Sequence, residues 1–339
     1  MTQREFAKKL SVSQATISMA LKDSPAISKE LRDKIRQMAA EAGYSPNIAG
    51  QLLRRGKNNL LGVIFPKVQT TYYSDFLLEI FRCAQKLGYL VLLENIRNDE
   101  DVQTAVKNLT RYHVSGILAM CGEATLKYFD PSVPTVFLYG FSSENTSGWH
   151  SNVYFDMYQA GRVAGELLLK TGRKHMTYLG RALEWENRYR GFYEVCSLHK
   201  DIVINWVDGV QNDTECGYAL TETLLKDFPE TDVIIAHNDS MAFGALRRLW
   251  EAGISVPERM MIIGFDNAFM GRYSTPSLTS VGPDIGELAS KAIQTILKSI
   301  EDPDFHCQIP VQCKVFLRES CGPVHQKSEC CNKTQKNKE

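Results

Sequence analysis

Residues 10–35 read LSVSQATISMALKDSPAISKELRDKI, and small or polar residues stand at positions where a core helix would carry large apolar ones. Capping residues divide the first 43 residues into three short expected helices, which begin after Thr2, Ser13 and Ser28. Gly43 suits the position after the last helix, because a left-handed backbone is common there. The stretch therefore predicts a small all-α bundle.

The second expected helix has a slim, polar outer face, which the major groove of DNA requires of a recognition helix. A helix, a tight turn and a second helix form the layout of a helix-turn-helix. The residues that we expect to contact DNA from this segment are Thr2, Gln3, Ser13, Gln14, Ala15, Thr16, Ser18, Met19 and Lys22. An ordinary three-helix bundle without a DNA partner is the alternative.

Charge is distributed unevenly along a chain that is neutral as a whole. Residues 1–57 carry 11 Lys and Arg against 5 Asp and Glu, and the rest of the chain carries 28 against 34. A basic segment attached to an acidic remainder indicates that the small part meets a polyanion while the large part has another task.

Short apolar runs alternate with amphipathic stretches from Leu60 onward, and a second series of this kind begins near Met157. The alternation predicts parallel sheets covered by helices on both faces, arranged as two α/β lobes. The expected boundaries are a helix-turn-helix domain over 1–44, a hinge helix and linker over 45–59, a first lobe over about 60–154 plus 284–323, a second lobe over about 155–283, and a disordered tail over 324–339.

Residues 43–63, GYSPNIAGQLLRRGKNNLLGV, join the expected bundle to the lobes. With this joint and the helix-turn-helix pattern, the chain resembles the LacI/GalR (lactose-repressor) family of transcriptional regulators up to about Pro323. The resemblance implies a hinge helix that orders on operator DNA, with a leucine, here Leu53, that wedges into the minor groove. Further DNA contacts are expected from Asn47, Gly50 and Arg54. An exposed basic linker is the alternative for this segment.

Two positions depart from the pattern of the family. Ser11 stands where the turn between the two helices commonly has glycine, so we expect a strained or altered turn. Met19 occupies a position of the recognition helix that often holds a polar or basic residue. The resemblance therefore does not carry over an operator sequence.

The lobes resemble the type I periplasmic binding protein fold, in which a small effector binds between two subdomains, beyond the carboxyl ends of the strands. The candidate effector ligands are Asp156, Arg188, Asn238 and Asp266 by this resemblance, and Tyr72, Tyr73 and Ser74 by their place beyond the first strand of the first lobe. Asp and Asn at strand ends also cap helices, and Arg also forms surface ion pairs, so a structural role is the alternative for these polar residues. The effector class stays open between sugars and related metabolites.

Other function classes find little support. The sequence has no P-loop, G-x-S-x-G, H-E-x-x-H or strand-linked G-x-G-x-x-G motif, so we expect no enzyme activity and no cofactor. The nine cysteines form no CxxC pair and lack finger-like His spacing, so we expect no metal site. A solute-binding transport protein shares the two-lobed architecture, but it should carry a signal peptide and no basic head. We therefore expect a cytoplasmic, homodimeric DNA-binding regulator, a repressor rather than an activator, with operator DNA and a small-molecule effector as partners and no membrane partner.

Overall fold

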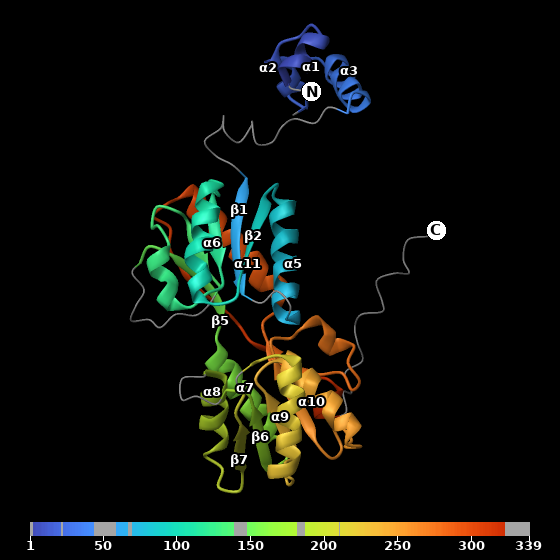
Figure 1. The fold of residues 1–339 in the computed structure, drawn as a ribbon, viewed down its shortest axis with the longest axis vertical. Helices are drawn as coiled ribbons and strands as arrows, with labels where there is room; N and C mark the ends of the chain where they lie inside the picture. Colours follow the sequence, from blue (N-terminus) through green and yellow to red (C-terminus); the bar gives the residue numbers. More distant parts are fainter. Residues whose placement is uncertain are drawn as a thin grey trace, which may run out of the picture. The chain divides into compact units, whose positions relative to one another are not determined.

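A computed structural model describes residues 3–21, 23–43, 59–66, 70–138, 148–181, 187–209 and 211–322. The chain divides into two compact units, Met1–Asn58 and Asn59–Glu339 (Figure 1). No helix within the described ranges is long and apolar enough to cross a membrane.

The first unit is a bundle of three described helices, α1 (Gln3–Lys9), α2 (Gln14–Leu21) and α3 (Lys29–Glu41). Ser13 Oγ accepts a hydrogen bond from the Thr16 amide at 3.0 Å, and Ser28 Oγ accepts one from the Leu31 amide at 3.3 Å. These bonds satisfy amides that the first turn of a helix leaves without partners. The small apolar core contains Phe6, Ala7, Ile17, Ala20, Ile35 and Ala39.

The first lobe of the second unit is a parallel sheet with helices on both faces. Its described strands run in the order β11-β5-β4-β3-β1-β2. Their bounds are β1 (Leu60–Pro66), β2 (Leu90–Ile96), β3 (Gly116–Ala119), β4 (Thr135–Phe137), β5 (Ser151–Phe155) and β11 (Gln308–Val311). One face is covered by α5 (Thr71–Lys86) and α11 (Ile285–Glu301), and the other by α6 (Asp99–Arg111) and η1 (Glu123–Tyr128). Burial of both faces explains why strands such as LLGVIF are almost wholly apolar.

The second lobe repeats this arrangement with its described strands in the order β12-β10-β9-β8-β6-β7. Their bounds are β6 (His175–Leu179), β7 (Val203–Val207), β8 (Val233–Ala236), β9 (Met261–Phe265), β10 (Thr279–Gly282) and β12 (Lys314–Phe316). One face is covered by α7 (Met157–Leu169) and α8 (Asn187–Cys196), and the other by α9 (Thr214–Asp227) and α10 (Asp239–Glu251). Two short helices, η3 (Phe269–Arg272) and η4 (Glu319–Cys321), complete the described part of this lobe.

Three described segments cross between the lobes, from β5 to α7, from β10 to α11 and from β11 to β12. The third crossover corrects our boundary, which assigned all of 284–323 to the first lobe. Helix α11 and strand β11 do lie there, but β12 pairs antiparallel with β10, with Phe316 opposite Ser280. A short strand at this position satisfies backbone groups at the edge of β10. Its three residues carry too little pattern to predict the pairing from sequence.

Candidate functional site

A cavity of about 270 Å³ lies between the two lobes of the second unit. It opens beyond the carboxyl ends of parallel strands, where sheets of this type bind ligands. The first lobe supplies Pro66, Thr70, Tyr72, Tyr73, Met120, Leu138, Tyr154 and Phe155, and the second supplies Met157, Arg188, Asn212, Asp213, His237, Asn238, Ser240 and Asp266. The cavity therefore has one mainly aromatic and apolar wall and one mainly hydrogen-bonding wall.

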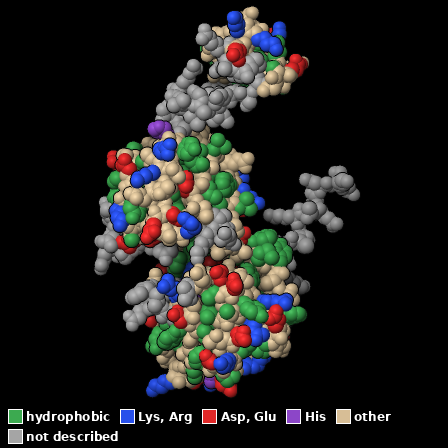
Figure 2. Space-filling model, in the orientation of Figure 1, with side chains coloured by type: hydrophobic (Ala, Val, Ile, Leu, Met, Phe, Trp, Pro, Cys, Tyr) green, Lys and Arg blue, Asp and Glu red, His purple; other side chains and the backbone are tan. Residues whose placement is uncertain are grey.

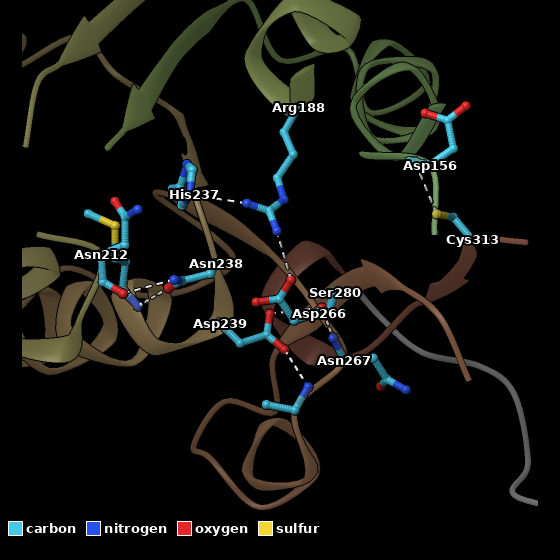
Figure 3. A network of polar contacts seen from close by, with 12 residues as sticks. Asp156, Arg188, Asn212, His237, Asn238, Asp239, Asp266, Asn267, Ser280 and Cys313 are labelled. Atoms are coloured by element: carbon cyan, nitrogen blue, oxygen red, sulfur yellow. Dashed lines mark hydrogen bonds and ion pairs between the residues drawn. The ribbon is translucent and has the colours of Figure 1, made fainter. Parts of the chain in front are cut away.

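Arg188, in the first turn of α8, is a buried cation of the polar wall (Figure 3). Its Nη1 lies 3.1 Å from His237 Nε2, and its Nη2 donates to Asp266 Oδ1 at 3.1 Å. Two glycines position it, because a Cβ on Gly161 would lie 2.0 Å from the Arg188 carbonyl oxygen, and a Cβ on Gly191 would lie 2.0 Å from a carbonyl oxygen of α7. The close approach of α7 and α8 thus fixes the start of α8 and the base of the arginine side chain.

His237, at the end of β8, orients Arg188 from the other side. Burial, followed by the positive charges of Arg188 and Arg181, lowers the pKa of His237 well below its usual value. A guanidinium only donates hydrogen bonds, so Nε2 must accept from Arg188. The neutral ring therefore carries its proton on Nδ1, which donates to the Tyr178 hydroxyl at 3.1 Å.

Asp266 lies in a strained turn after β9, where its φ is +97° and that of Asn267 is +54°. Such a backbone persists only when surrounding contacts hold it. Here Ser280 Oγ accepts a hydrogen bond from the Asn267 backbone amide at 2.9 Å. The Asp239 carboxylate accepts one from the Ala268 backbone amide at 2.7 Å and another from the Ser280 hydroxyl at 2.8 Å. Burial, and then the charge of Asp266, raises the pKa of Asp239 well above its usual value. The second lobe therefore holds the carboxylate of Asp266 beside Arg188 by a dedicated network (Figure 3).

Tyr72 and Tyr73, in the first turn of α5, form part of the opposite wall. The Tyr72 ring lies 5.4 Å from that of Tyr73 and 6.3 Å from that of Phe155, measured between ring centroids. Burial, and then the negative charge of Asp266, raises the pKa of the Tyr72 hydroxyl well above its usual value. Tyr72 therefore stays a neutral phenol, with an apolar ring and a hydroxyl that can donate or accept.

Five of the seven predicted effector ligands line the cavity: Tyr72, Tyr73, Arg188, Asn238 and Asp266. Asn238 also has the alternative role, because its Oδ1 accepts from the Met241 amide at 2.9 Å and caps α10. Its Nδ2 donates to the Asn212 carbonyl oxygen at 2.8 Å. One amide therefore caps a helix and holds the loop before α9 against the cavity.

The other two predicted ligands do not line the cavity. Asp156 is exposed and caps α7, since its Oδ1 accepts from the Gln159 amide at 3.0 Å. Ser74 is exposed, and its hydroxyl donates to the Thr71 carbonyl oxygen at 2.9 Å, one turn back in α5. Local hydrogen bonds at the start of a helix account for both side chains. The effector contacts expected from Asp156 and Ser74 are therefore not part of the cavity lining.

His237, Asp213 and Met157 belong to the lining and were missed by the sequence interpretation. His237 had a usable signal, because it directly precedes the strand-end Asn238 that the interpretation selected. Asp213 also caps α9, where its Oδ1 accepts from the Cys216 amide at 2.9 Å. Among the described residues, no group of three or more His, Cys, Asp or Glu side chains lies together as a metal site would need.

The candidate DNA-contacting face lies on α2. Ile17 and Ala20 point into the bundle, whereas Ala15 is exposed and Gln14, Thr16, Ser18 and Met19 are partly exposed. The Ser13 and Thr16 hydroxyls lie 2.8 Å apart, which ties two of the expected DNA contacts together. The residues that lie outside the described part are Thr2, Lys22, Asn47, Gly50, Leu53, Arg54 and the side chain of Gln3. The DNA contacts expected from them remain predictions.

A helix-turn-helix bundle and a two-lobed unit with a central cavity define a class of protein that joins DNA binding to ligand binding. Residues 2–47 match the family profile of bacterial regulatory proteins of the lacI family, and residues 165–321 match that of the periplasmic binding protein-like domain. The chain is therefore similar to bacterial regulators of the lacI family over residues 2–47 and to periplasmic binding proteins over residues 165–321. This confirms the predicted fold class and the predicted DNA-binding function.

Individual relatives cover nearly the whole chain. The chain is 26% identical over 332 residues to the transcriptional repressor PurR of Histophilus somni, covering 94% of this chain and 98% of that protein. It is 27% identical over 330 residues to the ribose operon repressor of Halalkalibacterium halodurans, covering 94% and 96%.

Two solved structures have the same fold. The lac repressor dimer bound to operator and the anti-inducer ONPF matches with a TM-score of 0.79 at 21% identity, covering 95% of this chain and 99% of that one. A LacI-family regulator from Enterococcus faecium with bound ribose matches with a TM-score of 0.69 at 25% identity, covering 78% and 99%.

Proposed function

We propose that the protein is a repressor that binds operator DNA as a homodimer, and that a small effector between its lobes changes its operator affinity. The observation that carries the proposal is the buried group of Arg188, His237 and Asp266, which faces an aromatic wall across the cavity. The named relatives are the transcriptional repressor PurR and a ribose operon repressor, and their names support repression rather than activation here.

The shape and chemistry of the cavity favour a small, neutral, ring-shaped effector. Its volume of about 270 Å³ lies just below the usual range of ligand pockets, which begins at about 300 Å³. Arg188 is paired with Asp266, and Asp213 adds a negative charge to the lining, so an anionic ligand would meet repulsion. Aromatic rings on one side suit the C–H face of a sugar, and polar groups on the other suit its hydroxyls. The bound ribose of the Enterococcus relative supports a sugar as the first class to test.

Large apolar side chains are exposed on α5 and η3, one element from each lobe, and they suit a homodimer interface. They are Leu78 and Phe81 of α5, Phe269 and Met270 of η3, and Tyr273 directly after η3, and Phe269 and Tyr273 are 51% and 66% exposed. Leu78 and Phe269 line a common groove beside the crossovers, so the two groups share one side of the unit. Figure 2 shows hydrophobic side chains, in green, exposed on both lobes. Apolar patches of this kind mark association surfaces.

We infer that the cavity binds its ligand without converting it, because the relatives are transcriptional repressors. We also infer that the protein is cytoplasmic, because a protein that binds operator DNA has to share a compartment with that DNA. The head argues against the alternative of a solute-binding transport protein, because residues 2–47 match a DNA-binding family.

The test begins with genome-wide mapping of binding sites, followed by operator titrations at several salt concentrations. Specific binding should weaken steeply as salt rises, because phosphate contacts release counterions. A thermal-shift screen of sugars, sugar acids, nucleosides and purines then finds the effector. Absence of specific DNA binding even at low salt, or of any response to the screened compounds, would contradict the corresponding half of the proposal.

Replacing Arg188 by Ala should weaken effector binding by about 2 to 4 kcal/mol, or about 30- to 700-fold in Kd, because charge-assisted hydrogen bonds are lost in a desolvated cavity. Operator affinity without effector should stay unchanged. Asp156→Ala is the matched control, since it removes an exposed cap and should cost about 1 kcal/mol of stability but no effector affinity. Wild-type effector binding by Arg188→Ala, measured by calorimetry, would remove the arginine from the site.

A further inference from the structure

We propose that Arg318 is a positioning residue that ties the effector-site Asp266 to the third crossover between the lobes. The inference rests on the proposed function, because it concerns how an effector bound in the cavity acts on the crossovers between the lobes. It assigns a role to a residue that lines no part of the cavity.

Arg318 follows β12, the strand that the third crossover delivers to the second lobe. Its backbone amide donates to Thr279 Oγ1 at 2.8 Å, and that hydroxyl donates back to the Arg318 carbonyl oxygen at 3.0 Å. This reciprocal pair fixes residue 318 against the start of β10. The backbone of the crossover is therefore anchored to the sheet that carries the effector site.

The guanidinium of Arg318 bridges two segments. Its Nη2 donates to Asn267 Oδ1 at 2.7 Å, and its Nη1 donates to the Leu278 carbonyl oxygen. Asn267 is the second residue of the strained turn that presents Asp266. A planar fork with several fixed donors can hold two acceptors at once, whereas the ammonium of lysine is a single point charge. Arginine at this position thus links the segment after β12 to the turn that presents Asp266.

The same turn also touches the second crossover. Gly282 is the last residue of β10, and a Cβ on it would lie 2.8 Å from the backbone carbonyl carbon of Asp266. The first and third crossovers also meet, because Cys313 Sγ lies 3.4 Å from the Asp156 carbonyl oxygen and donates to it (Figure 3). The turn of Asp266 and Asn267 therefore directly contacts Gly282, before the second crossover, and Arg318, after the third, and we expect a displacement of Asp266 to act on the crossovers through these contacts.

The test compares Arg318→Lys and Asn267→Gly with wild type in the full-length dimer. Glycine at 267 accepts the positive φ without strain, so this variant removes the side-chain amide that Arg318 contacts and leaves the backbone amide in place. Arg259→Lys is the matched control, because the Arg259 guanidinium also bridges two acceptors, the backbone carbonyl oxygens of Thr231 and Pro229, which lie just before β8 in the same lobe. Circular dichroism verifies that each variant is folded.

The first readout needs no effector. Hydrogen exchange of the Ala268 amide and of residues 311–314 should be faster in Arg318→Lys and Asn267→Gly than in Arg259→Lys. The second readout is the ratio of operator affinities with and without the compound that the thermal-shift screen selects, beginning with D-ribose. That ratio should move toward one by about 2- to 30-fold in both variants, the range in which residues along a coupling path act. Effector-free operator affinity should not change.

If Arg318 acts through Asn267, the double variant should be no worse than the more severe single variant, because the two substitutions remove one interaction. Wild-type exchange and a wild-type affinity ratio in Arg318→Lys would overturn the inference, and so would additive losses in the double variant. A wild-type protein that binds operator but responds to no compound would instead overturn the proposed function. The two failures are therefore distinguishable.

Discussion

One buried imidazole sets the geometry of the effector site at the scale of single residues. His237 is 8% exposed and lies between the Tyr178 hydroxyl and the Arg188 guanidinium. Only the neutral ring can accept from Arg188, and a protonated ring would repel it. The orientation of the arginine is therefore linked to the protonation state of its neighbour.

This linkage predicts a pH dependence of stability. In the unfolded chain His237 titrates near its usual pKa of about 6.5, whereas burial holds its pKa well below that value in the folded protein. Between these two values the unfolded chain binds more protons, so stability falls as pH decreases through the window. His237→Gln keeps an acceptor for Arg188 and cannot titrate, so its stability should fall less steeply over the same range.

The measurement is the midpoint of thermal unfolding for wild type and His237→Gln from about pH 8 down to pH 5, a range that brackets the free imidazole value. His199→Gln is the control, since it replaces an exposed histidine of the same lobe. Parallel curves for wild type and His237→Gln would show that His237 is not the group that titrates.

At the same scale, part of the candidate site could be predicted from the sequence and part could not. Arg188 and Asp266 followed from short motifs that belong to a recognisable family, and the structure brings them together. Asp156 and Ser74 do not line the cavity, because a residue at or near the start of a helix faces either the cavity or its own helix, and sequence does not distinguish the two. His237 was not predicted as a site residue, because its role depends on contacts with β6 and α8, which are distant in the chain.

At the scale of elements, the turn between α1 and α2 carries the departure that the sequence predicted. Ser11 has a φ of +54°, in the region that glycine occupies readily and other residues do not. The Ser11 amide donates to the Lys8 carbonyl oxygen at 3.2 Å and the Val12 amide to that of Ala7 at 3.1 Å, so the turn is held in this conformation. The strain is therefore stored between the two helices of the motif.

Ser11→Gly should relieve that strain and stabilise the head by about 0.5 to 1 kcal/mol. This net value is the free-energy cost of a left-handed serine minus the entropy that glycine adds to the unfolded chain. Hydrogen exchange of α1 and α2 amides in the full chain measures the change. Ala15→Gly is the control of opposite sign, since glycine within a helix costs up to about 1 kcal/mol. Faster exchange in Ser11→Gly than in wild type would show that the serine makes a contact worth more than the strain.

Long, periodic elements followed from the sequence, and short ones did not. The return of the chain to the first lobe at about residue 284 was expected, and the long helix α11 packs there. Strand β12 was assigned to the wrong lobe because three residues show no period, and its place depends on which sheet edge is open. The hinge around Leu53 lies outside the described residues, so its minor-groove wedge remains a prediction.

At the scale of the whole molecule, a switch requires that effector and DNA each prefer one arrangement of the same two-fold assembly. An effector that touches both lobes shifts the angle between them only if it binds one angle more tightly than another. Operator DNA likewise favours the dimer in which the two DNA-binding heads have the spacing of its half-sites. Each therefore changes the affinity for the other. The dimer interface has to span both lobes for this to work, and the exposed apolar residues of α5 and η3 meet that requirement.

Leu78→Glu should therefore separate the dimer without harming the cavity. A buried, unpaired carboxylate at an interface costs several kcal/mol, so the dimer Kd should rise by about 100-fold or more. A monomer reads only one half-site, so specific operator affinity should fall sharply while effector binding stays at the wild-type level. Leu198→Glu is the matched control, because Leu198 is 80% exposed and lies in the segment after α8, apart from α5 and η3. Analytical ultracentrifugation and operator titration measure both effects. A Leu78→Glu protein that stays dimeric and binds operator like Leu198→Glu would place the interface on another face, and the coupling would then have to run through different elements of the two lobes.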